Sequence, residues 1–355
     1  MIDGYLLNYL LLALLVTYPL SRFATGRVVR FLRRRAVLDH PNDRSSHVQP
    51  TPRGGGIAVI AILVITWGHF GVLVPAVAPQ LFTVLALAVA LGAVSWLDDL
   101  RGLNPFLRLA IQAVAVVVGL WTMPGDPIFQ GLLPTWAEQT ILALCWLWFI
   151  NLFNFMDGID GIAGAETAAI GFGIALVAII ATLGPDLALY GVTLAAAALG
   201  FLRWNWQPAQ IFLGDVGSVP IGFLIGWLLL TLAAEGAWIP ALILPLYYLA
   251  DATITLVKRL LRREKPWQAH RSHFYQRAAG APGTHAPVVR RINATNFALV
   301  VLAALAAKYP QIAPVALLSA AGFVGFLLWT FIRRPIPVPG SARHPRQSDT
   351  SSDKE

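Results

Sequence analysis

Charged residues are scarce in this chain. Asp, Glu, Lys and Arg make up only 12% of its 355 residues, whereas 57% are hydrophobic and the mean hydropathy is +0.66. Soluble globular proteins carry about 25% charged residues. The composition therefore excludes an ordinary soluble domain and predicts a polytopic membrane protein, whose helices satisfy their own backbone hydrogen bonds.

Cysteine is almost absent as well. The single residue, Cys145, lies inside an apolar run, which excludes a disulfide framework. The first apolar run has no basic segment before it, because the first basic residue is Arg22. This pattern favours a retained membrane span over a cleaved signal peptide.

The chain instead contains eleven apolar segments of about 16–22 residues, close to the length that crosses the hydrocarbon of a bilayer. We expect an all-α membrane domain over 1–334, with about eleven transmembrane helices. The remaining residues, 335–355, are rich in Pro, Ser, Arg and Asp, and we expect a disordered tail there. The apolar segments run roughly over 4–21, 55–74, 80–97, 106–122, 137–153, 163–183, 186–203, 217–234, 238–257, 295–309 and 313–332.

Basic residues are confined to alternate loops between these segments. If the N-terminus is outside, the inside segments hold 25 of the 26 Lys and Arg residues. This positive-inside pattern predicts a periplasmic N-terminus and a cytoplasmic C-terminus. It also argues against a nucleic-acid partner, because the basic residues are divided among short loops. The inside segments are 22–54, 98–108, 154–162, 203–216, 258–294 and 333–355, with 8, 2, 0, 1, 9 and 5 basic residues.

Two adjacent carboxylates, Asp98 and Asp99, follow the third apolar segment. They repel each other, and they lie at the end of a helix where the macrodipole disfavours negative charge. A divalent cation, or a metal-bound phosphate, would relieve both effects. The alternative is a solvated helix terminus at which Asp99 lies near Arg101.

Two further acidic motifs lie in loops on the same predicted side. Residues 154–161 contain a D-G-x-D-G core, in which glycines allow a ligand to approach and acids supply hard oxygen ligands. Residues 214–218, Gly-Asp-Val-Gly-Ser, can expose backbone N–H groups to phosphate at a helix N-terminus, with Asp215 holding Mg²⁺. The alternatives are a helix-ending turn and a helix cap.

Basic residues flank these acids in two loops. The segment 266–274 contains His270-Arg271-Ser272-His273, whose side chains could hold phosphate oxygens or lie against acidic lipids. Two histidines without cysteine argue against zinc. The first loop contains Arg44 and His47, and then Pro-Thr-Pro-Arg-Gly-Gly-Gly over 50–56, which could cradle a phosphate or simply break a helix.

Together, these five ordered motifs resemble the polyprenyl-phosphate N-acetylhexosamine-1-phosphate transferases, glycosyltransferase family 4. The resemblance covers about 40–335 and includes the phospho-MurNAc-pentapeptide translocase as a relative. An eleven-span chain is most similar to the branch that begins O-antigen and enterobacterial-type glycans. Because the peptidoglycan branch has three consecutive histidines where this chain has His270-Arg271-Ser272-His273, the resemblance favours a simple UDP-N-acetylhexosamine, of GlcNAc or FucNAc type, as donor.

The resemblance implies a role for each motif. Asp98 and Asp99 match the family's essential pair of acids. Asp215 matches the family's Mg²⁺ ligand, and Asp98 and Asp99 are implied as further ligands of this metal. The alternative metal is Mn²⁺. Other implied catalytic residues are Asp157, Asp160, His270 and His273. The implied substrate-binding residues are Arg44, His47, Arg53, Arg101, Asn154, Asn205, Phe212 and Arg271, of which Asn205 and Phe212 would contact the uracil.

The implied reaction joins undecaprenyl phosphate to a UDP-N-acetylhexosamine, with release of UMP, at the cytoplasmic face of a bacterial inner membrane. The expected partners are these two substrates and the lipid bilayer, and a homodimer is compatible with the sequence. Three alternatives stay open: a phospho-MurNAc-pentapeptide transferase, a transporter with Asp251 on an ion path, and a CDP-alcohol phosphotransferase. The last lacks support because its D-G-x-x-A-R pattern is missing.

Overall fold

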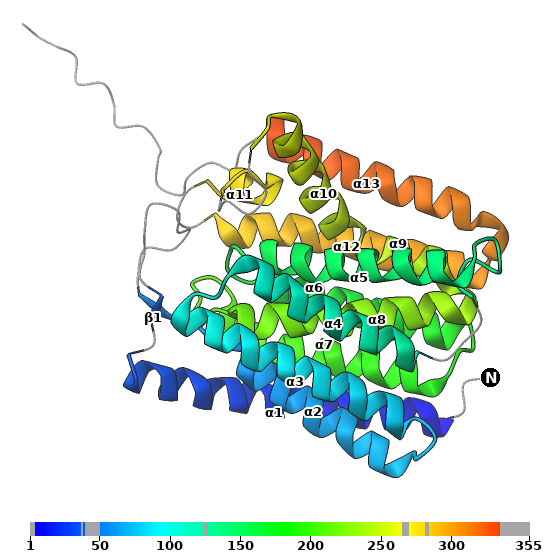
Figure 1. The fold of residues 1–355 in the computed structure, drawn as a ribbon, viewed down its shortest axis with the longest axis horizontal. Helices are drawn as coiled ribbons and strands as arrows, with labels where there is room; N and C mark the ends of the chain where they lie inside the picture. Colours follow the sequence, from blue (N-terminus) through cyan, green and yellow to red (C-terminus); the bar gives the residue numbers. More distant parts are fainter. Residues whose placement is uncertain are drawn as a thin grey trace, which may run out of the picture.

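The protein is a bundle of long helices that lie side by side (Figure 1). The computed structural model describes residues 4–36, 38–39, 50–123, 127–264, 270–280 and 284–333. Within these residues, ten helices are long and apolar enough to cross a membrane, so the expected all-α, multi-pass architecture is confirmed. The expected tail over 335–355 lies outside the described residues.

The helices follow the expected apolar segments closely in most of the chain. The only strands in the described residues are β1 (Leu38–Asp39) and β2 (Thr51–Pro52), which pair antiparallel. The helices are α1 (Gly4–Arg34), α2 (Gly56–Leu73), α3 (Ala78–Arg101), α4 (Pro105–Thr122), α5 (Thr135–Phe155), α6 (Ile162–Ile180), α7 (Pro185–Asn205), α8 (Asp215–Leu232), α9 (Trp238–Ile243), α10 (Leu246–Leu261), α11 (Phe274–Ala278), α12 (His285–Lys308) and α13 (Ala313–Arg333), with short turns at η1 (Ala233–Ala237) and η2 (Pro310–Ile312).

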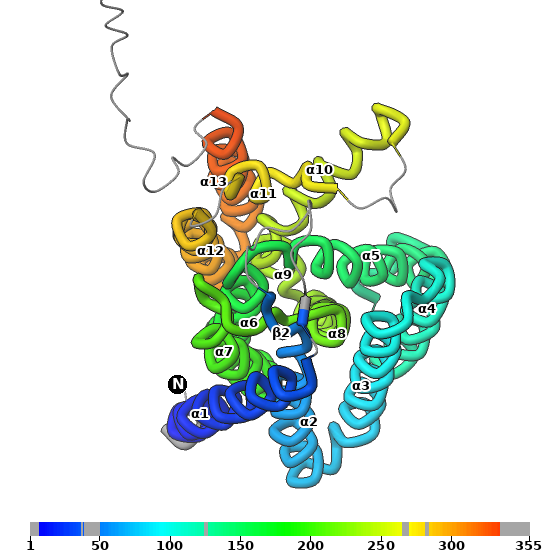
Figure 2. The backbone as a smooth tube through the Cα atoms, turned by 90° about the vertical axis from the view of Figure 1, so that its left-hand side faces the viewer, coloured from blue at the N-terminus to red at the C-terminus, as the bar shows by residue number. Residues whose placement is uncertain are grey.

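The expected continuous span over 238–257 is wrong, and this accounts for ten long helices instead of about eleven. The chain leaves helical geometry at Gly236, whose φ is +92°, and the region then divides into α9 and α10. Pro245 stands directly before α10, where it cannot donate the backbone hydrogen bond that a continuous helix requires. Figure 2 shows α10 reaching away from the rest of the bundle.

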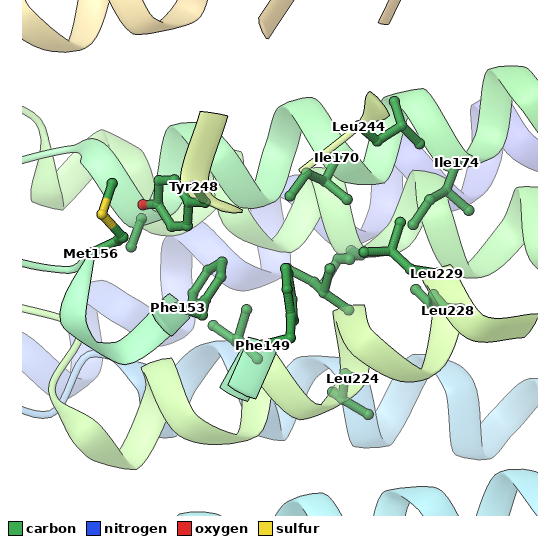
Figure 3. Packing of buried hydrophobic residues seen from close by; sticks show 14 of the residues in the cluster. Phe149, Phe153, Met156, Ile170, Ile174, Leu224, Leu228, Leu229, Leu244 and Tyr248 are labelled. Atoms are coloured by element: carbon green, nitrogen blue, oxygen red, sulfur yellow. The ribbon is translucent and has the colours of Figure 1, made fainter. Parts of the chain in front are cut away.

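The core of the bundle is formed by α6, α7 and α8. In their most apolar stretches, 78%, 72% and 83% of residues are buried, against 17% in α1. Small residues permit this: a Cβ added at Gly171 would lie 2.7 Å from the Gly191 carbonyl oxygen. Figure 3 shows how Phe149 and Phe153 of α5 pack beside Tyr248 and the leucines of α8. This packing fixes the ends of α5, α6 and α8.

Those ends meet at what we call the acidic end of the bundle, where α3, α5 and α7 end and α6 and α8 begin. It contains Asp98, Asp99, Asp157, Asp160 and Asp215. All three acidic motifs found in the sequence therefore lie at the same end of the structure.

Candidate active site

The two carboxylates of the Asp-Asp motif are held in the last turn of α3. The helix ends at Gly102, whose φ of +67° suits glycine, and its N–H donates to the Asp98 carbonyl oxygen at 2.8 Å. The Leu103 N–H donates to Asp98 Oδ1 at 2.6 Å. The turn after α3 thus orients Asp98, while Asp99 receives no such backbone support from this turn.

Two arginines connect these carboxylates with Asp215 at the start of α8. Arg53 Nη2 lies 2.6 Å from Asp215 Oδ1 and 3.0 Å from Asp99 Oδ1. Arg108 Nη1 lies 2.5 Å from Asp98 Oδ2 and 3.8 Å from Asp215 Oδ2. Two half-buried guanidinium groups therefore connect three carboxylates from α3 and α8, two helices that are far apart in the sequence. The sequence pattern predicts these acids on the same side of the membrane.

Arg108 is the site residue that sequence reasoning missed. It was counted among the basic residues of the inside loops but was not assigned to the site. The signal was available, because a charged residue in the first turn of an otherwise uncharged membrane helix is costly unless it has a partner. Arg101, which was predicted instead, is exposed at the end of α3.

The three carboxylates match the donor set of a magnesium site only in part. Asp99 Oδ2 is buried and has no hydrogen-bond partner, so one hard oxygen is available. Among the described residues, however, no group of three acids or histidines is arranged to hold a metal ion, and each of the three acids is paired with an arginine. Mg²⁺ commonly uses only one or two protein carboxylates and completes its coordination shell with waters and substrate phosphates. The acids of this site can supply that number of carboxylates.

Glycines and a serine at the start of α8 lie next to this cluster of carboxylates. Gly214 has a φ of +76°, and a Cβ on Gly56 would lie 2.1 Å from the Gly217 Cα, so the two backbones are in direct contact. Ser218 Oγ accepts a hydrogen bond of 2.8 Å from Asn154 Nδ2. This bond joins the end of α5 to α8 and places Asn154 beside the acids.

The loop between α5 and α6, which we call the D-G loop (157–161), holds two acids with different surroundings. Burial raises the pKa of the half-buried Asp157 well above its usual range; Arg53 lowers it, and the charges of Asp215 and Asp160 raise it further. Asp157 thus shares an electrostatic environment with the carboxylate cluster, and its predicted catalytic role stays a prediction.

Asp160 has instead a set of fixed partners. Its Oδ2 accepts from the Ala209 N–H at 3.1 Å, and its Oδ1 lies 3.3 Å from Nδ1 of His285 at the start of α12. Asn205 is similar, because its Oδ1 accepts from the Gly161 N–H and its Nδ2 donates to the Ile211 carbonyl oxygen. Both residues brace the loops; the catalytic role predicted for Asp160 and the uracil contact predicted for Asn205 stay predictions.

The predicted basic loop is anchored by a buried acid of α10. Asp251 is fully buried and accepts from the backbone N–H groups of Phe274 and Tyr275, at 3.0 and 3.1 Å. Its Oδ1 also lies 3.2 Å from His273 Nδ1. These contacts leave no carboxylate oxygen of Asp251 for an ion path, which argues against the transporter alternative.

The imidazole ring of His270 stacks on that of His273, and the two ring centroids are 5.0 Å apart. Burial lowers the pKa of His270 to about 4, and the neighbouring His273 and Arg259 add to this effect. His270 is consequently neutral near pH 7 and can offer hydrogen bonds but no charge. Arg271 is exposed, whereas both histidines line the cavity described next.

A cavity of about 660 Å³ extends from the acids between α3, α4, α5 and α8, with α10 at one side. Its polar end contains Asp98, Arg108, Asn154, Asp215, His270 and His273. Most of the remaining wall is apolar and includes Leu91, Val94, Leu109, Leu144, Leu147 and Val219. A molecule with an anionic head and an apolar tail would match this cavity, which has a polar end and a mostly apolar wall.

Two predicted substrate contacts, Arg44 and His47, lie outside the described residues. Phe212 is placed beside Arg53: the two form a parallel bridge, and the Phe212 carbonyl oxygen accepts from the N–H groups of Gly54 and Gly55. The expected Gly-rich segment is therefore fastened to the loop before α8, next to the carboxylates.

Comparison with known proteins agrees with this arrangement. Residues 81–233, which include Asp98, Asp99, the D-G loop and Asp215, match the model of glycosyl transferase family 4. Over these residues the chain is similar to the members of this family. The match extends from α3 to the end of α8 and so contains the carboxylate cluster and its supporting helices.

Several relatives within the family are similar to the chain over most of its length. A protein of Bacillus subtilis named "probable undecaprenyl-phosphate N-acetylglucosaminyl 1-phosphate transferase" is 26% identical over 76% of each chain. A phospho-N-acetylmuramoyl-pentapeptide-transferase of Microcystis aeruginosa is 30% identical over 61% of this chain and 64% of that protein. A decaprenyl-phosphate N-acetylglucosaminephosphotransferase of Mycolicibacterium smegmatis is 32% identical over 61% and 57%. The alignments thus span between about half and three quarters of these relatives.

Proposed function

We propose that this protein transfers an N-acetylhexosamine 1-phosphate from a UDP-sugar to undecaprenyl phosphate and releases UMP. The observation that carries the proposal is the cavity, which joins an apolar wall to a polar end that contains Asp98, Asp215 and Arg108. The names of the relatives support both the lipid acceptor and the sugar phosphate. The product would be the first lipid-linked intermediate of O-antigen or a similar surface glycan.

In this reaction, a phosphate oxygen of the lipid attacks the β-phosphorus of the UDP-sugar. The bond from the β-phosphorus to the bridging oxygen breaks, and UMP leaves with that oxygen. The lipid phosphate is already ionised near neutral pH, so its position and the charges around it matter more than proton removal. Arg108, which faces the cavity, is placed to hold this phosphate by charge-assisted hydrogen bonds.

A divalent cation, Mg²⁺ or Mn²⁺, would be held by Asp215 with Asp98 and Asp99, and would neutralise charge on the diphosphate. The acids would then exchange arginine partners for the metal, while Arg53 and Arg108 turn to the phosphates. Both arginine side chains are 39% exposed, which gives them room to turn.

The decisive experiment measures UMP release by purified protein given undecaprenyl phosphate, Mg²⁺ and one of three donors. We expect release from UDP-GlcNAc or a UDP-FucNAc-type sugar, and none when the lipid is omitted. A second candidate function, phospho-MurNAc-pentapeptide transfer, is favoured by relatives with that name. Preferential use of UDP-MurNAc-pentapeptide would select it, and no UMP from any donor would refute both.

The proposal also places the active site in the cytoplasm. With Cys145 replaced by Ala, a cysteine at Ser272 should resist an impermeant thiol reagent in intact cells, and one at Gly236 should react. The reverse labelling would overturn the proposed orientation.

A further inference from the structure

A buried acid that the proposed reaction does not use lies in the second turn of α6. Glu166 is 1% exposed, and its one hydrogen bond comes from Asn296 of α12, whose Nδ2 donates to Glu166 Oε2 at 2.6 Å. Asn296 is itself 2% exposed. Among the described residues, no Lys, Arg or His forms an ion pair with Glu166.

The second oxygen of each side chain in this pair lacks a partner. Glu166 Oε1 and Asn296 Oδ1 are both buried and make no hydrogen bond within the described residues. Inside a membrane bundle there is little water to replace such a bond, and a buried carboxylate with one neutral donor is strongly disfavoured. The two unsatisfied atoms are both acceptors, so a single hydrogen between them would satisfy both.

We propose that Glu166 is a neutral carboxylic acid, and that it forms a pair of hydrogen bonds with Asn296 that fastens α6 to α12. The Glu166 Oε1–H donates to Asn296 Oδ1, while Asn296 Nδ2–H donates to Glu166 Oε2. The pair is closed on itself and carries no charge, which suits its position.

The location of the pair gives it a positioning role. The α6 helix begins at Ile162, directly after the D-G loop, and Glu166 lies one turn further on. The α12 helix begins at His285, which contacts Asp160 of the same loop. One contact therefore holds the D-G loop against α12, and the other holds the start of α6, which follows that loop; together they restrain the position of Asp157 relative to the carboxylate cluster.

The test uses Glu166→Gln, since a glutamine amide can make the same two bonds with Asn296 without any proton to lose. The matched control is Glu235→Gln, an exposed acid in η1. Infrared spectra of the purified protein at neutral pH should contain a protonated-carboxyl C=O band. Because Asp157 can contribute to the same band, we expect its intensity to fall in Glu166→Gln and to stay at the wild-type level in Glu235→Gln.

Thermal unfolding and kinetics complete the test. Glu166→Gln should keep the wild-type melting temperature and turnover, whereas Glu166→Leu and Asn296→Leu should melt lower and lose kcat by up to about a hundredfold with little change in KM. Only the kinetic readout rests on the proposed transferase function; the spectral and thermal readouts do not.

Two results would overturn the inference. If the spectrum of Glu166→Gln matches that of wild type, Glu166 is ionised, and a water or cation bridges the two oxygens. If Glu166→Gln lowers the melting temperature or the turnover as much as Glu166→Leu does, the negative charge itself is needed.

Discussion

Four acids of this protein, Asp99, Asp215, Asp160 and Asp251, fall into two groups that the sequence does not distinguish. Asp99 and Asp215 are held mainly by arginine side chains, which are half-buried and able to move. Asp160 and Asp251 are held by backbone N–H groups and histidines. The first group lies where charge can be exchanged for a ligand, and the second fixes loops in place.

This difference shows why partners are more informative than residue type. An arginine can leave a carboxylate when a metal–diphosphate arrives, because the guanidinium then binds phosphate instead. A backbone N–H group that loses its acceptor inside the bundle finds no replacement. We therefore expect changes in the first group to affect turnover, and changes in the second to affect stability.

The largest effect is expected for Asp215→Asn. The isosteric amide removes the charge that would hold the cation and pair with Arg53, so UMP release should fall by at least about a hundredfold while the protein still folds. Asp186→Asn, at the start of α7 and far from the acidic end, is the matched control. A loss smaller than about tenfold would place Asp215 in the second group.

Arg108→Ala should produce the next largest effect. A charge-assisted hydrogen bond to phosphate is worth about 1.5–3 kcal/mol, which corresponds to about a ten- to hundredfold loss in kcat/KM. The exposed Arg271→Ala should lose less, since Arg271 does not line the cavity. Initial rates of UMP release for both variants test this order, and equal losses would show that the loop around Arg271 closes on the substrate.

Asp251→Asn should mainly lower stability. The amide keeps one oxygen for the N–H groups of Phe274 and Tyr275, which now use both carboxylate oxygens. Leaving a buried donor unsatisfied costs about 1–3 kcal/mol in the free energy of unfolding. Denaturant unfolding in detergent would measure this loss. An unchanged midpoint together with lost turnover would make Asp251 a functional acid after all.

The smallest effect is expected from His270 and depends on pH. Its pKa in the folded protein, about 4, lies below the usual histidine value of 6.5. The unfolded chain therefore binds more protons between these values, and stability falls as pH drops through this window. His270→Gln should reduce this acid sensitivity and leave the neutral-pH melting temperature nearly unchanged. Parallel melting curves of wild type and variant from about pH 7 to 4 would contradict the assignment.

The sequence by itself determined that this is a helical membrane protein, because long apolar segments leave the backbone few other ways to satisfy its hydrogen bonds in lipid. It also determined the position of most helices and the three acidic motifs, since charges so near apolar segments are costly and stand out. The division into α9 and α10 was harder to predict, because apolar content alone does not show where Gly236 and Pro245 interrupt a helix.

Only the tertiary structure decided which partners each acid has. Asp98 and Asp215 are separated by more than a hundred residues, and packing of α3 against α8 brings both of them to Arg108. Arg108 and His285 acquire their significance only from such contacts, as does the pairing of Glu166 with Asn296. A sequence lists the charges of a chain, but the partners that set the energy of each charge come from helices that meet only after folding.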